Sequence, residues 1–371
     1  MSSQPVLNDE SFMERALELA RSAIGSVEPN PAVGSVITTA DGKFIAEGFH
    51  AEFGGPHAEV VALQAAGTQA RGATIYVTLE PCSHLGKTPP CADALIAAGV
   101  SRVVIGTVDP APHVAGTGIT KLREAGIQVD VGVCEAEAQN LIAPFRKLFT
   151  QNLPFVHAKW AMTLDGKIAT HTGSSKWISN KKSRAIVHQL RGRMDAILSG
   201  IGTVLADDPL LTARPAGRRV PLRVILDSQA RLPLDSNLVK TAHESPVLLF
   251  VSDQANPARV ADLKKYGVEV IQIQRTLETG LLDIISLLEE LGRRQLTNVL
   301  IEAGSGVLGA FLDAQQVDEV HCFIAPKLIG GANALSPFGG FGLESMENAV
   351  QLRQHNIEVL DGDLYIHGRV H

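Results

Sequence analysis

The sequence has few cysteines and no long hydrophobic run, and each absence excludes a class of protein. Four cysteines in 371 residues are too few for a disulfide scaffold. No apolar run reaches the roughly 18 residues that a membrane span needs, and the polar stretch Met1 to Glu10 is unlike a signal peptide. The net charge is −6, so no strong positive field favours nucleic acid or an anionic membrane. We therefore expect a cytoplasmic protein that binds neither nucleic acid nor membrane.

What the sequence does contain is the composition of a soluble globular protein with room for two domains. Hydrophobic residues make up 45% and charged residues 19% of the 371 positions. The first part of the chain alternates between helical and extended patterns. We expect helices at 11–25, 57–66, 91–98 and 118–125, and strands at 32–39, 44–49, 73–79, 102–108 and 127–131. Such alternation predicts an α/β sheet with helices on its faces.

A second alternation begins after Asn152-Leu153-Pro154, so we expect domains at residues 1–150 and 151–371, each with three layers. In this second part we expect helices at 180–191, 258–266 and 281–292. The expected strands are 155–162, 196–199, 222–227, 247–251, 268–273 and 298–302, with an antiparallel pair at 317–325 and 358–370. The sequence has no internal repeat, and the two halves share no motif.

The first half carries a pattern typical of a catalytic zinc site. His57-Ala58-Glu59 precedes Pro81-Cys82, and Cys91 follows. One imidazole and two thiolates can hold zinc at three corners and leave the fourth open for water. Zinc lowers the pKa of that water, and an adjacent Glu59 suits a proton shuttle, as in the zinc nucleobase deaminases. A structural zinc site and Cys134 as a competing ligand remain alternatives at this point.

The spacing of the two cysteines departs from the general deaminase signature, because eight residues separate them instead of two. With PNPAVG at 29–34, HAE at 57–59 and PCSHLGKTPPC at 81–91, the chain resembles the bifunctional pyrimidine deaminase/reductase family of riboflavin biosynthesis, in which this gap is the norm. The resemblance implies an N-terminal cytidine-deaminase-like domain with Glu59 as the catalytic residue. It implies that the zinc ligands are His57, Cys82 and Cys91. It also implies substrate contacts at Asn30, His50, His84, Lys87 and Asp109.

These residue types agree with the implied roles, and two positions depart from the family pattern. Lys87 suits a phosphate, and Asn30 and Asp109 can read the amide and amino edges of a ring. Ala111 and Val61 stand where the family usually has asparagine. Neither change touches the expected zinc ligands or the proton shuttle, so they bear on substrate affinity and not on the type of reaction.

The second half resembles the reductase domain of the same family, which is similar to dihydrofolate reductase and uses NADPH. The resemblance rests on KWAMTLDGKIA at 159–169, GTVLADDP at 202–209 and the glycine-rich EAGSGVLG at 302–309, where backbone N–H groups can approach a phosphate. It implies contacts to NADPH at Ala161, Trp177, Thr203, Asp207, Ser228, Gly304, Ser305, Gly306, Val307, Leu308, Gly309 and Ala310. It implies substrate contacts at Ser175, Arg191, Leu211, Arg214 and Glu302, while Lys159 and Asp165 could orient the sugar or supply a proton.

We therefore predict a bifunctional enzyme of riboflavin biosynthesis that uses Zn²⁺ and NADPH. It would remove an amino group from a phosphorylated pyrimidine by hydrolysis and then reduce the ribosyl side chain to ribityl. We expect a small-molecule substrate and a homo-oligomer. One alternative is a stand-alone nucleoside or tRNA-adenosine deaminase with an unrelated C-terminal ligand-binding domain, although the net negative charge argues against tRNA. Another is a sensor that binds NADPH or a pyrimidine without turnover.

Overall fold

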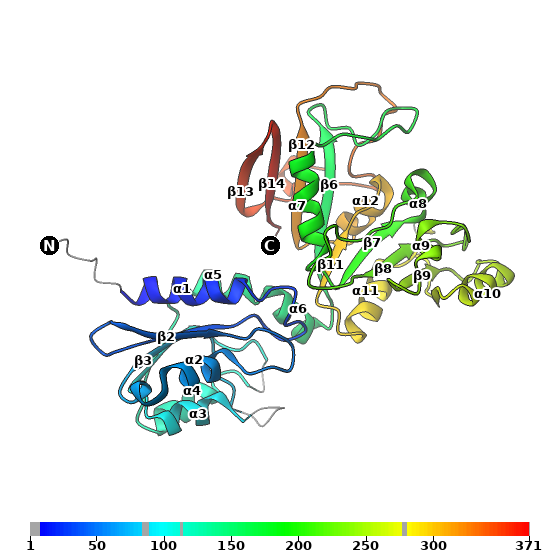
Figure 1. Cartoon of the computed structure of the whole chain (residues 1–371). Helices are drawn as coiled ribbons and strands as arrows, with labels where there is room; N and C mark the ends of the chain where they lie inside the picture. Colours follow the sequence, from blue (N-terminus) through cyan, green and yellow to red (C-terminus); the bar gives the residue numbers. More distant parts are fainter. Residues whose placement is uncertain (1–7, 84–88, 112–113, 277–279, 371) are drawn as a thin grey trace. The chain divides into compact units, whose positions relative to one another are not determined.

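The chain forms two compact units, Met1–Asn152 and Leu153–His371, in a computed structural model that describes residues 8–83, 89–111, 114–276 and 280–370 (Figure 1). The first unit contains one sheet of five strands in the order β2-β1-β3-β4-β5. Its strands are β1 (Gly34–Thr38), β2 (Phe44–Phe49), β3 (Thr74–Leu79), β4 (Arg102–Thr107) and β5 (Gln128–Val131). β1 runs antiparallel to β2 and β3, whereas β3, β4 and β5 are parallel.

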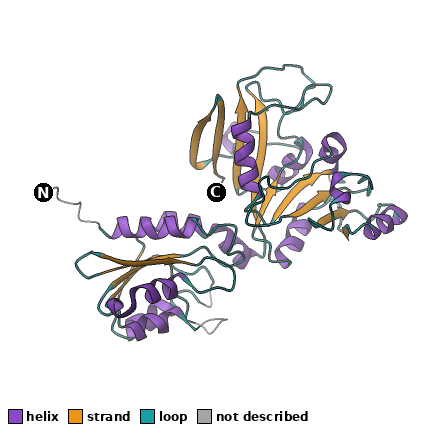
Figure 2. Ribbon diagram, viewed as in Figure 1, coloured by secondary structure: helices purple, strands orange, loops and turns teal. Residues whose placement is uncertain are grey.

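Helices cover both faces of this first sheet, as the colouring by secondary structure in Figure 2 shows. They are α1 (Asp9–Arg21), α2 (Ala58–Ala66), the 3₁₀ helix η1 (Gly67–Ala70), α3 (Cys91–Ala98), α4 (Thr117–Glu124), α5 (Glu135–Leu141) and α6 (Ala143–Gln151). Ile75 and Val77 of β3 pack with α2, α3 and α4, while Tyr76 packs with α1 and α5 on the opposite face. Alternate side chains of a strand point to opposite faces, so the buried strand serves both helix layers. This confirms the predicted three layers.

The second unit contains a mixed sheet of nine strands in the order β10-β9-β8-β7-β11-β6-β12-β14-β13. Its strands are β6 (Phe155–Thr163), β7 (Ala196–Gly200), β8 (Leu222–Leu226), β9 (Val247–Val251), β10 (Glu269–Gln272), β11 (Asn298–Ile301), β12 (Glu319–Ala325), β13 (Arg353–Leu360) and β14 (Asp363–Arg369). The strands from β10 to β12 are parallel, and β14 and β13 add an antiparallel hairpin to β12.

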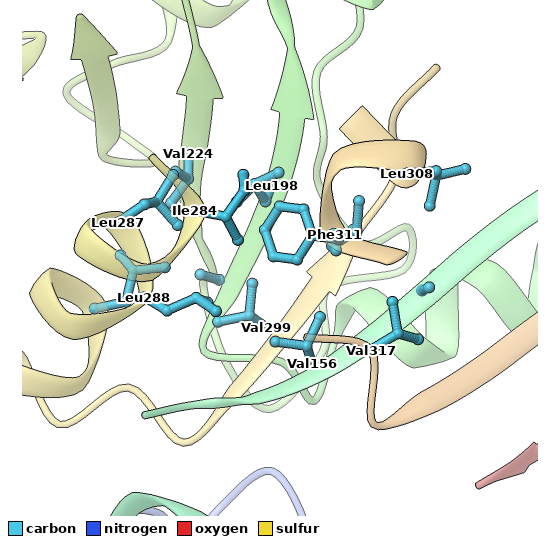
Figure 3. Packing of buried hydrophobic residues seen from close by; sticks show 14 of the residues in the cluster. Val156, Leu198, Val224, Ile284, Leu287, Leu288, Val299, Leu308, Phe311 and Val317 are labelled. Atoms are coloured by element: carbon cyan, nitrogen blue, oxygen red, sulfur yellow. The ribbon is translucent and has the colours of Figure 1, made fainter. Parts of the chain in front are cut away.

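The helices of the second unit again lie on both faces of the sheet. They are α7 (Lys181–Arg191), α8 (Ile201–Asp207), α9 (Asn237–Lys240), α10 (Pro257–Lys265), α11 (Ile284–Arg293) and α12 (Ser305–Asp313), followed by the 3₁₀ helix η2 (Met346–Asn348). Leu287 and Leu288 of α11 and Phe311 of α12 pack on Val156 and Val299 at one face (Figure 3). On the other face, α7 to α10 pack on the alternate side chains of the same strands. The second unit is therefore also three-layered, as predicted.

The structure differs from the expected elements at several places. The first helix begins at Asp9, because the Asn8 side chain accepts a hydrogen bond from the Ser11 N–H and caps it. Helices α5 and α6 occupy a region where no pattern was expected. The predicted strand 358–370 is wrong as one element, because Asp361 and Gly362 have positive φ and turn the chain between β13 and β14. Within the described residues, no helix combines the length and apolar character that crossing a membrane requires.

Candidate active site

The three predicted metal ligands meet in the first unit, and each is placed by the local fold. His57 is the N-cap of α2, Cys91 is the first residue of α3, and Cys82 follows β3. The His57 Nδ1 atom lies 3.2 Å from the Cys91 Sγ atom and 3.6 Å from the Cys82 Sγ atom. All three ligand atoms lie within 4.8 Å of one another. Two helix N-termini and one strand end thus bring one nitrogen and two sulfurs to a single point.

This donor set fits zinc in chemistry and in size. Zinc–nitrogen bonds of about 2.0 Å and zinc–sulfur bonds of about 2.3 Å in a tetrahedron place nitrogen and sulfur about 3.6 Å apart. The observed separations of 3.2 and 3.6 Å leave room for an ion of that kind. The Cys91 N–H also donates to the Cys82 Sγ atom at 3.3 Å. A backbone donor at a helix N-terminus stabilises a thiolate, which is the form that binds metal.

The electrostatics of Glu59 and Cys82 agree with this assignment. Hydrogen bonding with the Cys91 side chain, helped by His57 and opposed by burial, lowers the pKa of Cys82 to about 4. Glu59 is only 3% exposed, and burial raises the pKa of its carboxyl to about 7. A carboxyl group with a pKa near neutrality can both accept and release a proton. The site therefore pairs an anionic sulfur ligand with an acid suited to proton transfer.

A cavity of about 350 Å³ opens onto the metal ligands. Its wall contains Asn30, Pro31, Val33, His50, Phe53, Gly54, Gly55, His57, Glu59, Leu79, Glu80, Cys82, Asp109, Ala111, Val114, Phe145 and Phe149. The Asn30 side-chain amide donates to His50 Nε2 at 3.1 Å, and His50 Nδ1 donates to the Pro56 carbonyl at 2.9 Å. These bonds fix the orientation of both side chains. The cavity is in the volume range of small-molecule sites.

The structure brings most of the predicted deaminase substrate contacts to this cavity. Asn30, His50 and Asp109 line it, while His84 and Lys87 lie outside the described residues. Ala111 also lines it, and its N–H donates to the Asp109 carboxylate at 2.8 Å. Ala111 thus helps to hold Asp109 through its backbone, which needs no asparagine side chain. Val61, the other departure from the family pattern, lies on α2 and is not part of the cavity wall.

Sequence reasoning missed one buried acid of this cavity, Glu80. Its carboxylate accepts from four backbone N–H groups, those of Asp109, Gly116, Gly118 and Ile119, at 2.9 to 3.3 Å. The acid therefore fixes the segment that carries Asp109 against the strand end that carries Cys82. Its position directly before Pro81-Cys82 is a signal that could have identified it. Its partners follow 29 to 39 residues later, so no local pattern reveals them.

Cys134, the competing ligand, is not part of the metal cluster. It is the N-cap of α5, and its Sγ atom contacts the Glu10 carbonyl at 3.9 Å. Burial raises the pKa of its thiol. Among the described residues, the cluster that contains cysteines consists of His57, Cys82 and Cys91.

In the second unit, a buried ion network forms where β6, β11 and α7 meet. The Glu302 carboxylate lies 2.5 Å from Arg191 Nε, 3.0 Å from Arg191 Nη2 and 3.3 Å from Lys159 Nζ. Burial opposes the ionisation of Glu302, but the charges of Arg191 and Lys159 outweigh it and lower the pKa to about 2. Arg191 also donates to the Thr212 carbonyl at 3.1 Å. The structure therefore brings together Lys159 and two predicted substrate contacts, Arg191 and Glu302. Arg191 is already bonded to Glu302 and to the Thr212 carbonyl.

The predicted glycine-rich turn lies at the N-terminus of α12. Gly304 is the N-cap of α12, which begins at Ser305 directly after the carboxyl end of β11. A Cβ atom on Gly306 would meet nothing within 4 Å, and one on Gly304 would meet only the Thr203 hydroxyl at 3.8 Å. The first turn of α12 thus has open space beside it and Thr203 close to it. Backbone N–H groups at such a helix N-terminus can approach an anion.

Three further predicted cofactor residues have partners within the protein. The Trp177 ring is 65% exposed, with the Arg184 guanidinium 4.4 Å from its centre. Asp207, at the end of α8, pairs with Lys176 at 2.9 Å. The Ser228 carbonyl accepts from the Ser252 hydroxyl. These three residues are held by protein contacts, and Ala161 is a half-buried residue of β6.

The remaining predicted reductase residues differ in exposure. Leu211 is buried with a positive φ of 51°, Arg214 is exposed, and Ser175 is half-buried. The Arg214 N–H donates to His188 Nδ1 at 3.2 Å. The Asp165 carboxylate accepts from the N–H groups of Ile329 and Gly330, so it holds a loop and is not directed to Lys159.

The fold and the His–Cys–Cys cluster together define a zinc-binding deaminase domain, followed by a second α/β domain. Residues 7–107 match the family described as the cytidine and deoxycytidylate deaminase zinc-binding region. Residues 154–366 match the RibD C-terminal domain. The chain belongs to the RibD family of bifunctional deaminase/reductase enzymes of riboflavin biosynthesis. The match of its second half rules out the alternative of an unrelated C-terminal domain.

The similarity extends over nearly the whole chain. Riboflavin biosynthesis protein RibD of Aquifex aeolicus is 42% identical over 360 residues, which cover 96% of this chain and 97% of that protein. The Escherichia coli protein of the same name is 40% identical over 375 residues, covering 97% and 99%. The solved structure of Acinetobacter baumannii RibD superposes with a TM-score of 0.84 at 38% identity, covering 97% and 98%. A Thermotoga maritima structure gives 0.82 at 41% identity, covering 98% and 99%.

Proposed function

We propose that the chain converts one phosphorylated pyrimidine in two steps. The first removes the 2-amino group of 2,5-diamino-6-(5-phosphoribosylamino)pyrimidin-4-one, and the second reduces the ribosyl side chain of the product to ribityl with NADPH. The similar Thermotoga maritima protein is described as a diaminohydroxyphosphoribosylaminopyrimidine deaminase/5-amino-6-(5-phosphoribosylamino)uracil reductase. We assign the deaminase to residues 1–150 and the reductase to residues 151–371.

The observation that carries the deaminase proposal is the cavity that joins the metal ligands His57 and Cys82 to Glu59, Asn30 and Asp109. In the proposal, Asn30 and Asp109 bind the amide and amino edges of the ring, and His50 holds Asn30 in place. Glu80 fixes the backbone that presents Asp109. His84 and Lys87 would complete the site at the ribose phosphate. The side chains of Asn30 and Asp109 can hydrogen-bond to a polar ring, and a lysine such as Lys87 can bind a phosphate group.

Glu59 is the proposed proton carrier. Zinc held by His57, Cys82 and Cys91 would lower the pKa of a water molecule. Glu59 would take a proton from the attacking water and deliver it to the amino nitrogen, which leaves as ammonia. The oxygen of the water then remains on the ring carbon as a carbonyl group, and the second proton of the water ends on the adjacent ring nitrogen. Burial of Glu59 excludes bulk water from this transfer.

For the reductase we propose that the first turn of α12 and Thr203 bind the phosphates of NADPH. NADPH would supply the hydride. Ala161, Trp177, Asp207 and Ser228 are the further proposed cofactor contacts. Ser175, Leu211, Arg214 and Glu302 are the proposed substrate contacts, and Arg191 would act mainly by holding Glu302, to which it is bonded at 2.5 Å. The exposed Arg214 is the cation proposed for the substrate phosphate.

A coupled assay tests the substrate and cofactor. Purified protein is mixed with the diaminopyrimidine substrate and NADPH, and ammonia and the absorbance of NADPH are followed together. We expect ammonia release and NADPH oxidation in equal amounts at completion. Ammonia without NADPH oxidation would contradict the reductase half of the proposal. NADH oxidised as readily as NADPH would contradict the cofactor assignment.

We also propose that the chain forms a homo-oligomer through the sheet edge at β13. This strand is exposed over most of its length, with Ile357 and Val359 61% and 69% exposed. A strand at the edge of a sheet with exposed apolar side chains favours pairing with another chain. Light scattering on the purified protein should give a multiple of the mass of one chain, and Ile357→Lys should reduce it to a monomer. A monomeric wild-type protein would contradict this proposal.

A further inference from the structure

A second cluster of metal-ligand residues lies in the second unit, on the sheet face that α7 covers. His157 of β6 and Glu319 of β12 stand opposite each other in the strand register, and His321 is two residues further along β12. The two histidines are 6% and 1% exposed, and the Glu319 side chain is 17% exposed. His157 Nδ1, His321 Nε2 and a Glu319 oxygen face one another. Neither proposed reaction uses this cluster.

The outer nitrogens of both histidines have their own partners. His157 Nε2 lies 3.2 Å from Asn298 Oδ1, which is an acceptor, so Nε2 carries the proton and Nδ1 presents a lone pair to the cluster. His321 Nδ1 lies 2.8 Å from the hydroxyl of Tyr365. When that hydroxyl accepts, His321 Nε2 also presents a lone pair. Ring nitrogens oriented in this way by outer partners are typical of metal-binding histidines.

The distances within the cluster leave room for an ion between the ligands. His321 Nε2 lies 3.4 Å from His157 Nδ1 and 3.3 Å from Glu319 Oε1, and His157 Nδ1 lies 3.8 Å from that oxygen. Strong charge-assisted hydrogen bonds to a carboxylate are shorter, at about 2.7–2.9 Å. Nitrogen and oxygen ligands about 2.0 Å from a tetrahedral zinc ion are about 3.3 Å apart. The triangle therefore has the size of a zinc coordination sphere.

We propose that His157, Glu319 and His321 form a second divalent-metal site, selective for zinc-like transition ions and separate from the cysteine site. Two imidazoles and one carboxylate are a ligand set for such ions, and water would complete the coordination. The other Glu319 oxygen lies 3.7 Å from Arg369 Nε, which orients the carboxylate.

The position of the site gives it a structural role in the reductase unit. An ion there would join β6 to β12 directly. His321 stands opposite Lys159 in the register of these strands, and Lys159 bonds to Glu302. The ion would thus fix the strand pair beside the Lys159–Glu302–Arg191 network. It would act by positioning that network and not by contacting the substrate.

Cobalt(II) binding to the full-length protein tests this site. The double variant Cys82→Ser/Cys91→Ser removes the thiolates of the first site, so any remaining specific site has nitrogen and oxygen ligands. After treatment with a chelator and dialysis against Co²⁺, we expect one equivalent of cobalt with visible d–d bands and no thiolate-to-cobalt charge-transfer band. Adding His321→Gln should remove that equivalent. His367→Gln is the matched control, because His367 stacks near His321 but pairs with Glu358.

Two more variants keep the test independent of folding. Glu319→Gln preserves the shape of the side chain and should weaken cobalt binding, and Tyr365→Phe removes an outer partner and should lower affinity roughly 10- to 100-fold. Circular dichroism identifies the variants that remain folded. The proposal is overturned if the cysteine double variant retains no cobalt, which would indicate a hydrogen-bonded cluster without an ion. It is also overturned if His321→Gln and His367→Gln retain equal amounts, which would indicate adventitious surface binding.

Discussion

Replacement of Glu302 by glutamine should destabilise the second unit strongly. The side chain is only 8% exposed, and it bonds to Arg191 and Lys159. These two cations lower the pKa of Glu302 from 4.5 to about 2 in spite of its burial. That difference corresponds to roughly 3 kcal/mol of unfolding free energy at neutral pH. The contribution is present above pH 4.5 and is lost as the pH falls towards 2.

The loss of unfolding free energy in Glu302→Gln should be of similar size, because the substitution leaves two buried cations without their counter-charge. Breaking a buried ion pair costs about 3–5 kcal/mol. For a unit of this size that loss should lower the melting temperature by roughly 6–20 °C. Calorimetry on the full-length protein would measure the shift. Asp262→Asn is the control, because its pair with Lys265 is exposed and should contribute less than about 1 kcal/mol.

A double-mutant cycle separates the ion pair from other effects of the substitution. Arg191→Met removes the main cation, and the double variant Arg191→Met/Glu302→Gln should be less destabilised than the sum of the two single variants. The expected coupling energy is about 1–3 kcal/mol. If the effects of the two substitutions on the unfolding free energy are strictly additive, the ion pair does not stabilise the folded state, because the two side chains then do not interact.

Three other predictions follow from the structure. Arg102 lowers the pKa of Asp9, so Asp9 contributes stability above pH 3.8 that is lost as the pH falls through its lower folded-state pKa. Acid unfolding of Asp9→Asn should therefore depend less on pH than acid unfolding of the wild type, and an unchanged curve would contradict this. A Cβ atom on Gly118 would lie 2.1 Å from the Pro81 carbonyl oxygen, so Gly118→Ala should lower the free energy of unfolding by about 1–3 kcal/mol and reduce ammonia release. Gly116→Ala is the control for backbone strain alone, because Gly116 has a positive φ but open space around it. Arg214→Ala should raise the reductase KM for the pyrimidine roughly 10- to 100-fold with little change in NADPH affinity, and the opposite pattern would refute its assignment to the substrate phosphate.

The parts of the site that lie in short contiguous motifs could be predicted from the sequence. His57, Cys82 and Cys91 could be predicted because the His-x-Glu segment, the Pro-Cys segment and the following cysteine form a zinc-deaminase pattern in the residue order itself. The alternation of buried strands and amphipathic helices likewise predicted the two three-layer units. The strand and helix order is therefore encoded locally over most of the chain.

Contacts between distant residues could not be predicted in the same way. Glu80 is satisfied by backbone N–H groups, and backbone groups leave no trace in the residue pattern. His157 and His321 are 164 positions apart and meet only because β6 pairs with β12. The engagement of Arg191 by Glu302 likewise depends on which strands are neighbours in the sheet. Such features require the topology of the fold, which local propensity does not determine.

In the proposed function, two separate sites act in sequence, deamination first and reduction second. The variant Glu59→Gln tests it most directly when it is supplied, in separate reactions, with the diaminopyrimidine and with its deaminated product. We predict neither ammonia nor NADPH oxidation with the diaminopyrimidine, zinc content equal to that of the wild type, and normal NADPH oxidation with the deaminated product. NADPH oxidation by this variant with the diaminopyrimidine, or its absence with the deaminated product, would contradict the account.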